Sequence, residues 1–142
     1  MKRAFQNTPV RVVELKRGDA TATFTLHPLP LGWHAMLARV YPAPVEFVGT
    51  GTGPAQARPV ESASYEHGYR TSLILIAKGL QDQVEAIAPT TDDRASWDRY
   101  AVKVQTEMET AGLVEGDILL LKRELDKVNA GVARQGNVVA PS

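Results

Sequence analysis

The sequence predicts an α+β fold in which an N-terminal β-hairpin packs on a small bundle of about four helices. Near the N-terminus, two alternating segments flank Arg17-Gly18-Asp19, which favours a turn because glycine and aspartate adopt turn conformations readily. Four later segments repeat apolar residues at intervals of three and four, as amphipathic helices do. At 142 residues the chain fits one domain, and we assign residues 10–129 to it.

The strands of the expected hairpin are residues 10–16 and 20–27. In the second strand, Ala22, Phe24 and Leu26 share one face, whereas threonines occupy the other. This alternation predicts a sheet with one packed face and one face in water.

Two prolines, Pro28 and Pro30, end the second strand because proline cannot donate a hydrogen bond to a ladder. Pro30 also suits the first turn of a helix, which we expect to continue to about Tyr41. The apolar residues of this helix form one stripe: Trp33, Leu37, Val40 and Tyr41. We expect the stripe to cover the apolar face of the hairpin, so that Trp33 and Phe24 share one core.

Three further helices are expected. One spans residues 64–80, with Gly79 marking its end. Its core stripe comprises Tyr65, Tyr69, Leu73, Ile76, Ala77 and Leu80. The next is capped at its start by residues 91–92 and at its end by Gly112 in a left-handed conformation. The last begins at residues 115–117. Its buried seam comprises Ile118, Leu121, Leu125 and Val128.

Three segments lack any apolar period. We expect residues 1–9 to form a flexible arm and residues 130–142 a disordered C-terminal segment. Residues 43–63 are rich in glycine, proline, alanine and threonine, and we expect a mobile loop there. A long loop without structure is unusual in a compact domain, so this one is either disordered or ordered by a partner.

Charge and composition exclude several kinds of partner. Sixteen basic residues balance sixteen acidic ones, so no net positive field attracts nucleic acid. The longest apolar runs are far shorter than the roughly 20 residues of a membrane span, and no membrane association is expected. The N-terminus lacks the apolar core of a signal peptide, and cysteine is absent. We therefore expect a cytoplasmic protein.

No catalytic, cofactor-binding or metal-binding residues are predicted, and we expect no enzymatic activity. His27 and His34 lack a third ligand at suitable spacing, and no serine lies in a nucleophile elbow. The acidic residues of the last two helices have basic neighbours and indicate solvated helix faces. These acidic residues are Glu107, Glu109, Glu115, Asp117, Glu124 and Asp126.

Three segments follow one another along the chain: FTLHPLPLGWHAMLARVYPAP, YEHGYRTSLILIAKGL and ETAGLVEGDILLLKRELDKVN. The first contains a Pro-Leu-Pro-Leu-Gly joint, and the last an Ala-Gly-Leu turn followed by a Gly-Asp helix start. In this order and spacing they resemble the small tail assembly chaperone-type proteins of tailed bacteriophages and prophages. The resemblance spans about residues 21–129.

The resemblance implies a protein made in the cytoplasm of the infected host cell. It implies binding to the long helical tape measure protein, which is kept soluble while the tail tube polymerises, and absence from the finished virion. The family has no catalytic residues. A virion structural protein, such as a tail or head-completion subunit, is the alternative, and an uncharacterised enzyme or regulator is a third class.

A chaperone for an apolar helix needs an apolar surface of its own. Three leucines fall outside the expected stripes, and we predict that they bind a partner: Leu75, Leu119 and Leu120. The partner is either the tape measure protein or a second copy of the chain. Ordinary core packing is the alternative for each leucine. Surplus leucines on a small helical domain also favour a homo-oligomer, as a dimer or a ring.

Overall fold

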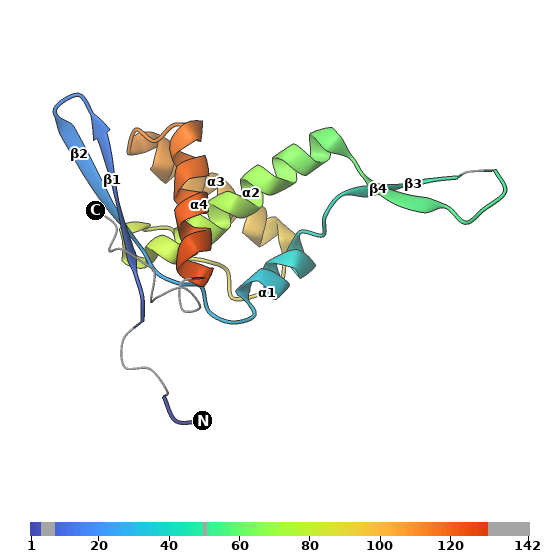
Figure 1. Ribbon diagram of the computed structural model, residues 1–142, viewed down its shortest axis with the longest axis horizontal. Helices are drawn as coiled ribbons and strands as arrows, with labels where there is room; N and C mark the ends of the chain where they lie inside the picture. Colours follow the sequence, from blue (N-terminus) through green and yellow to red (C-terminus); the bar gives the residue numbers. More distant parts are fainter. Residues whose placement is uncertain (4–7, 50, 131–142) are drawn as a thin grey trace.

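The computed structural model describes residues 1–3, 8–49 and 51–130. Along the chain the elements are β1 (Arg11–Arg17), β2 (Ala20–Leu26), α1 (Trp33–Val40), β3 (Val45–Val48), β4 (Gln56–Pro59), α2 (Glu61–Leu80), the short 3-10 helix η1 (Gln81–Gln83), α3 (Arg94–Thr110) and α4 (Glu115–Ala130). The α+β class is confirmed, with an antiparallel hairpin before the four helices. Figure 1 shows β1 and β2 beside α4, whereas β3 and β4 extend away from the opposite end of α2.

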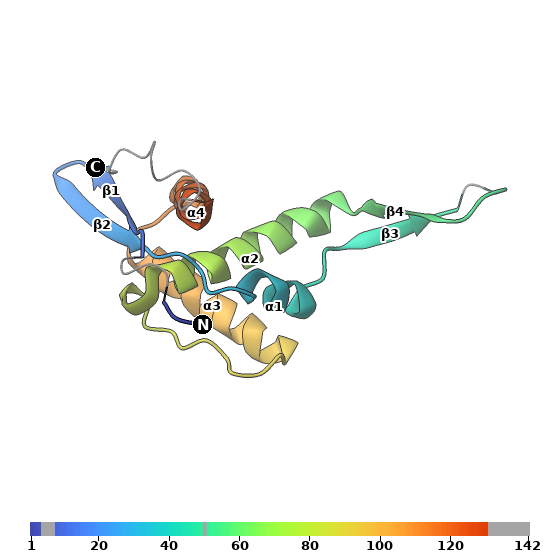
Figure 2. The same ribbon diagram turned by 60° about the horizontal axis from the view of Figure 1, so that its bottom comes forward.

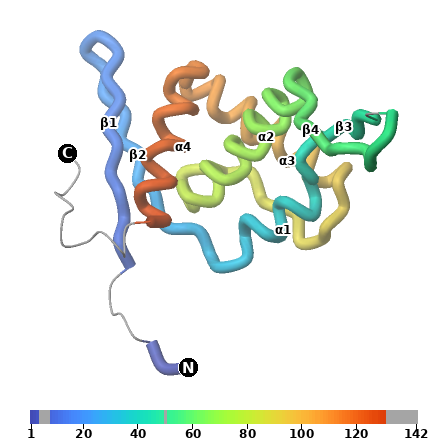
Figure 3. The backbone as a smooth tube through the Cα atoms, turned by 45° about the vertical axis from the view of Figure 1, so that its right-hand side comes forward, coloured from blue at the N-terminus to red at the C-terminus, as the bar shows by residue number. Residues whose placement is uncertain are grey.

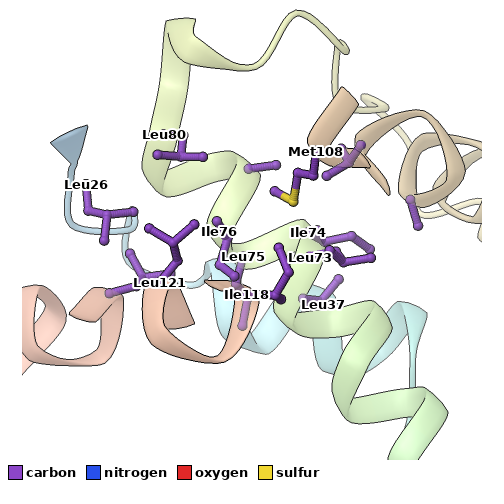
Figure 4. Packing of buried hydrophobic residues seen from close by; sticks show 14 of the residues in the cluster. Leu26, Leu37, Leu73, Ile74, Leu75, Ile76, Leu80, Met108, Ile118 and Leu121 are labelled. Atoms are coloured by element: carbon purple, nitrogen blue, oxygen red, sulfur yellow. The ribbon is translucent and has the colours of Figure 1, made fainter. Parts of the chain in front are cut away.

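The C-terminal half of α2 is the centre of the core. Five consecutive residues, from Leu73 to Ala77, are buried, because α3, α4 and β2 all pack on this half of the helix (Figure 2). Figure 4 shows Leu26 and Leu121 converging on Ile76 from two of these elements. The N-terminal half of α2 leaves the bundle, and its residues are exposed or half-buried.

The β1–β2 hairpin presents its predicted apolar face to α2 and α4. Val13 pairs with Phe24 and Leu15 with Ala22, so these residues share one face. Val13, Leu15 and Leu26 are buried and Phe24 is half-buried. Ala22 is exposed because the tip of the hairpin extends beyond the helices (Figure 1).

Trp33 and Phe24 pack on the same core, as expected, but the expectation that α1 covers this hairpin is wrong. Figure 3 shows α1 on the far side of α2 from β1 and β2. Its first residue, Trp33, packs edge to face on Trp97 of α3, with ring centroids 5.9 Å apart, and beneath the ammonium of Lys78 in α2. The helix begins after Gly32, whose φ of 83° suits glycine, and not at the preceding proline. The residues before Pro28 and Pro30 favour extended conformations, and the connection carries the chain past α2.

Two ion pairs fasten α4 to β1. Arg11 binds Glu124, and Arg17 binds Asp117, both through short side-chain hydrogen bonds. Asp117 also accepts a hydrogen bond of 2.9 Å from the backbone N–H of Val114, which closes the first turn of α4. The prediction that these two carboxylates lie on a solvated face is wrong, since 6 % of Asp117 and 8 % of Glu124 are exposed.

The expectation of a loop without regular structure at residues 43–63 is also corrected. Strands β3 and β4 pair as an antiparallel hairpin, and α2 begins at Glu61. One face of this β3–β4 hairpin is apolar, comprising Val45, Phe47, Ala57 and Pro59, and all four are exposed. The other carries the ion pair between Glu46 and Arg58, at 2.6 Å. Four residues are the shortest run in which alternation indicates a strand, and the consecutive apolar residues Phe47 and Val48 interrupt it in β3.

The mobility expected for residues 43–63 stays a prediction. Residues 4–7 of the expected N-terminal arm, and all but the first residue of the expected C-terminal segment, lie outside the described residues. That first residue, Ala130, ends α4.

Caps define the start and end of α3. Asp93 accepts a hydrogen bond of 3.2 Å from the backbone N–H of Ser96, so the helix is capped one residue later than predicted. At the other end, Gly112 has the predicted left-handed conformation, with φ of 86°. The N–H of Leu113 donates to the carbonyl of Met108 at 3.0 Å, which completes a Schellman motif and turns the chain into α4.

Gly79 is required for close packing between three elements. Its carbonyl accepts a hydrogen bond of 2.8 Å from the N–H of His27. A β-carbon at this position would lie 2.7 Å from Cδ1 of Leu125. The glycine therefore permits α4 and the end of β2 to approach α2 closely. The sequence indicated only that Gly79 marks the end of the helix.

We expect Gly79→Ala to lower the free energy of unfolding by about 1–3 kcal/mol, because overpacking outweighs the better helix propensity of alanine. Gly68→Ala is the matched control, since it lies in the same helix and an added β-carbon meets no atom within 4 Å. The control should gain up to about 1 kcal/mol. Urea denaturation measures both changes, and stabilisation by both substitutions would contradict the packing argument.

The ion pairs between α4 and β1 predict a loss of stability in acid. A hydrogen bond from Arg17 lowers the pKa of Asp117. Burial alone raises the pKa of Glu124, but hydrogen bonds from Lys127 and Arg11 outweigh it and lower this pKa as well. Because both folded-state pKa values lie below the ordinary 3.8 and 4.5, the unfolded chain takes up protons first as the pH falls. The stabilisation is complete above about pH 5, and it is lost progressively as the pH falls below about 4 towards the folded-state pKa values.

We expect Asp117→Asn to destabilise the fold at about pH 7 and to have a smaller effect at about pH 2, because the carboxylate takes up a proton as the pH falls. The loss stays below the roughly 3–5 kcal/mol typical of a fully buried pair, because 53 % of the Arg17 side chain is exposed. Asparagine keeps an oxygen that accepts the Val114 hydrogen bond, so the substitution isolates the charge. Equal losses at the two pH values in urea unfolding would rule out the ion pair as their cause.

Candidate partner-binding groove

Exposed apolar side chains gather around the N-terminal half of α2. Tyr65, Val102 and Leu119 are each 64 % exposed, and Val114 is 59 % exposed. They line three open depressions with volumes of about 340, 340 and 290 Å³, and Tyr69 borders all three. We call this continuous surface the Tyr69 groove. Its apolar lining comprises Tyr65, Tyr69, Leu73, Ala101, Val102, Met108, Leu113, Val114, Ile118 and Leu119.

The groove exists because α2 is longer than the core that covers it. One depression lies between α2 and α3, another between α2 and α4, and the third where the turn from α3 to α4 faces α2. Buried residues such as Leu73, Met108 and Ile118 form the floor. The exposed apolar residues form the walls, so the groove is continuous with the core.

Hydrogen bonds from two tyrosines hold the walls in place. The Tyr65 hydroxyl donates to Glu115 at the start of α4, and this bond raises the pKa of Tyr65. The Tyr41 hydroxyl donates to Asp98 of α3 at 2.6 Å, and burial together with this bond raises the pKa of Tyr41. Arg70 of α2 lies over the Tyr41 ring, 5.6 Å from its centroid. The helices that form the groove are thus linked across it.

The structure places the three leucines predicted to bind a partner in three different environments. Leu119 is exposed on the groove, and Leu120 is half-buried against the core. The prediction for Leu75 is corrected, because it is 6 % exposed and Figure 4 shows it close to Ile118 and Leu121. It is buried because α2 is covered on several sides, whereas the prediction assumed one apolar stripe. The predicted seam of α4 is confirmed, with all four residues buried: Ile118, Leu121, Leu125 and Val128.

Sequence reasoning missed three of the four exposed groove residues. Tyr65 belongs to the predicted core stripe of its helix, yet it lies at the edge of the contact with α3 and α4, where 64 % of it is exposed. Val102 and Val114 lie outside the periodic stripes and were not considered. Tyr65 lies in a half of α2 that is rich in polar residues and contains Gly68, and this change in composition within one helix was the available signal.

Glu107 is another carboxylate that the sequence placed on a solvated face. It accepts hydrogen bonds from the backbone N–H groups of Glu85, at 2.6 Å, and Ala86, at 2.8 Å. It therefore anchors the connection between η1 and α3, and lies outside the groove.

Within residues 1–3, 8–49 and 51–130, no group of three or more histidine, cysteine, aspartate or glutamate side chains is arranged to hold a metal ion. The helices of this described part include none with the length and apolar character needed to cross a membrane.

Comparisons with protein-family models, with curated proteins and with solved structures returned no significant match to this chain.

We expect Leu119→Glu to change the free energy of unfolding by no more than about 0.5 kcal/mol, because the side chain is exposed. Leu121→Glu is the matched comparison two residues along the same helix, and it should prevent folding because Leu121 is fully buried. Thermal melts followed by circular dichroism test both. Unfolding of the Leu119 variant would show that this leucine belongs to the core.

Proposed function

We propose that the protein is a phage tail assembly chaperone that binds an apolar helical segment of the tape measure protein in the Tyr69 groove. The binding keeps that segment soluble in the host cytoplasm while the tail tube polymerises. One observation carries the proposal: four apolar side chains, each more than half exposed, surround a groove whose floor is the core of the protein.

The shape of the groove supports a helical partner. Grooves between helices bind amphipathic helices through apolar side chains spaced three and four residues apart. Three connected depressions that share Tyr69 offer successive positions for such side chains. The depressions are open to solvent, so a bound helix can leave them, which a chaperone requires because its client must later enter the tail. The proposal assigns no catalytic step to the chain.

Self-association is part of the proposal. The apolar face of the β3–β4 hairpin is exposed, and an isolated two-stranded hairpin is only marginally stable in water. The formal net charge of the chain is zero, so electrostatic repulsion does not oppose contact between copies. Both features favour a dimer or a ring.

The function is tested by producing the tape measure protein of the same phage together with the wild-type chain or a variant. We expect Tyr65→Ser combined with Leu119→Glu to leave the tape measure protein in the insoluble fraction and to abolish co-purification, because both walls of the groove lose apolar surface. Ile87→Glu is the control, since Ile87 is 88 % exposed but does not line the groove. The control should behave as the wild type.

Co-purification with the tape measure protein that survives the groove variant would overturn the proposed site. If the wild-type chain does not solubilise the tape measure protein, and if the chain is present in purified particles, the result favours a virion structural protein. Light scattering of the same purified proteins, with and without Phe47→Ser in the β3–β4 hairpin, tests self-association. A monomer at all concentrations would exclude the proposed dimer or ring.

A further inference from the structure

We propose that the Tyr69 groove selects helices whose apolar stripe is flanked by lysine or arginine side chains. This inference rests on the proposed function of the groove and names the chemistry of its partner. It is argued from the charged residues that line the groove, among which acidic residues outnumber basic ones. The carboxylates are Glu66, Asp98, Glu109 and Glu115, and the cation is Arg70.

The four carboxylates of the groove take part in none of the ion pairs of the described residues. Three of them accept hydrogen bonds from neutral donors: Asp98 from Tyr41, Glu109 from Gln105, and Glu115 from Tyr65. Within the described part of the chain, no lysine or arginine forms an ion pair with any of the four. The five ion pairs recorded there involve carboxylates outside the groove.

The charge also varies along the groove. Near Asp98, the guanidinium groups of Arg70 and Arg94 lie over the Tyr41 ring, 5.6 and 5.1 Å from its centroid, and reduce the local negative potential. The depression beside the turn from α3 to α4 is lined by Glu109 and Glu115 and by no cation. Basic residues of a bound helix are therefore favoured most strongly at this end.

The excess of carboxylates at the groove is specific to this surface, because the chain as a whole has a formal net charge of zero. Sixteen basic and sixteen acidic residues cancel, so the excess of carboxylates belongs to the groove and does not reflect an acidic protein. Complementary charges around an apolar contact accelerate encounter and set specificity, and like charges there disfavour the wrong partner. An acidic rim thus attracts a helix with basic flanks and repels one with acidic flanks.

Two synthetic helical peptides test the inference directly. Both carry the same leucine stripe with a period of three and four, but one has lysine and the other glutamate at the flanking positions. Fluorescence anisotropy with the full-length chain should show about tenfold tighter binding of the lysine peptide at low salt, because several weak exposed ion pairs add together. The difference should shrink in high salt, where exposed charges are screened.

Charge variants then locate the effect. Glu66→Lys combined with Glu109→Lys should remove or reverse the preference, since both residues line the groove and are exposed. Glu14→Lys combined with Asp92→Lys changes the net charge equally at exposed positions outside the groove and should preserve the preference.

The outcomes separate this inference from the proposed function. If the two peptides bind equally and Tyr65→Ser combined with Leu119→Glu abolishes this binding, the charge preference is overturned. The apolar groove then remains as the binding site. Binding of both peptides that survives the same groove variant would overturn the groove as the binding site. If the variant with Glu14→Lys and Asp92→Lys also loses the preference for the lysine peptide, the net charge of the protein, and not the groove, determines that preference.

Discussion

Burial of the C-terminal half of α2 on several sides is the constraint on which the rest of the structure depends. Residues 73–77 are buried in succession, which one packed face of a helix cannot achieve. Strand β2 approaches at Gly79, α3 contributes Trp97 and Met108, and α4 contributes its leucine seam. Short hairpins and isolated helices are marginally stable in water, so each of these elements depends on the shared core for its own stability.

The same constraint creates the Tyr69 groove. With 20 residues, α2 spans about 30 Å, and only its second half is enclosed. The first half extends between α3 and α4 without being covered, so apolar residues next to the core stay accessible. A surface of this kind is typical of a binding site, because apolar patches on soluble proteins are otherwise small and scattered.

Charged residues divide into two groups by location. On one side of α4, Asp117 and Glu124 face β1 and are neutralised by Arg17 and Arg11. At the groove, Glu109 and Glu115 face outward, with neutral hydrogen-bond donors as neighbours. The first group joins the hairpin to the helices, and the second remains available to a partner. Residues of one charge type therefore have different physical roles, according to what packs against them.

The sequence by itself determined the features that depend on local chemistry. The seam of α4, the alternation of β2 and the left-handed cap at Gly112 were all predicted, because helical period, strand period and glycine conformation are properties of neighbouring residues. Of the groove, Leu119 alone among the four exposed residues was predicted, from its position outside that seam.

Only the tertiary structure decided which elements meet. Three features bring together residues that are distant in sequence: the placement of α1 against α3, the burial of Leu75 and the pairing of Arg17 with Asp117. No local period in the sequence encodes such contacts. The exposure of Tyr65 has the same origin. Its spacing matches that of the buried residues of α2, and it faces water because the other helices cover the second half of α2 and not the first.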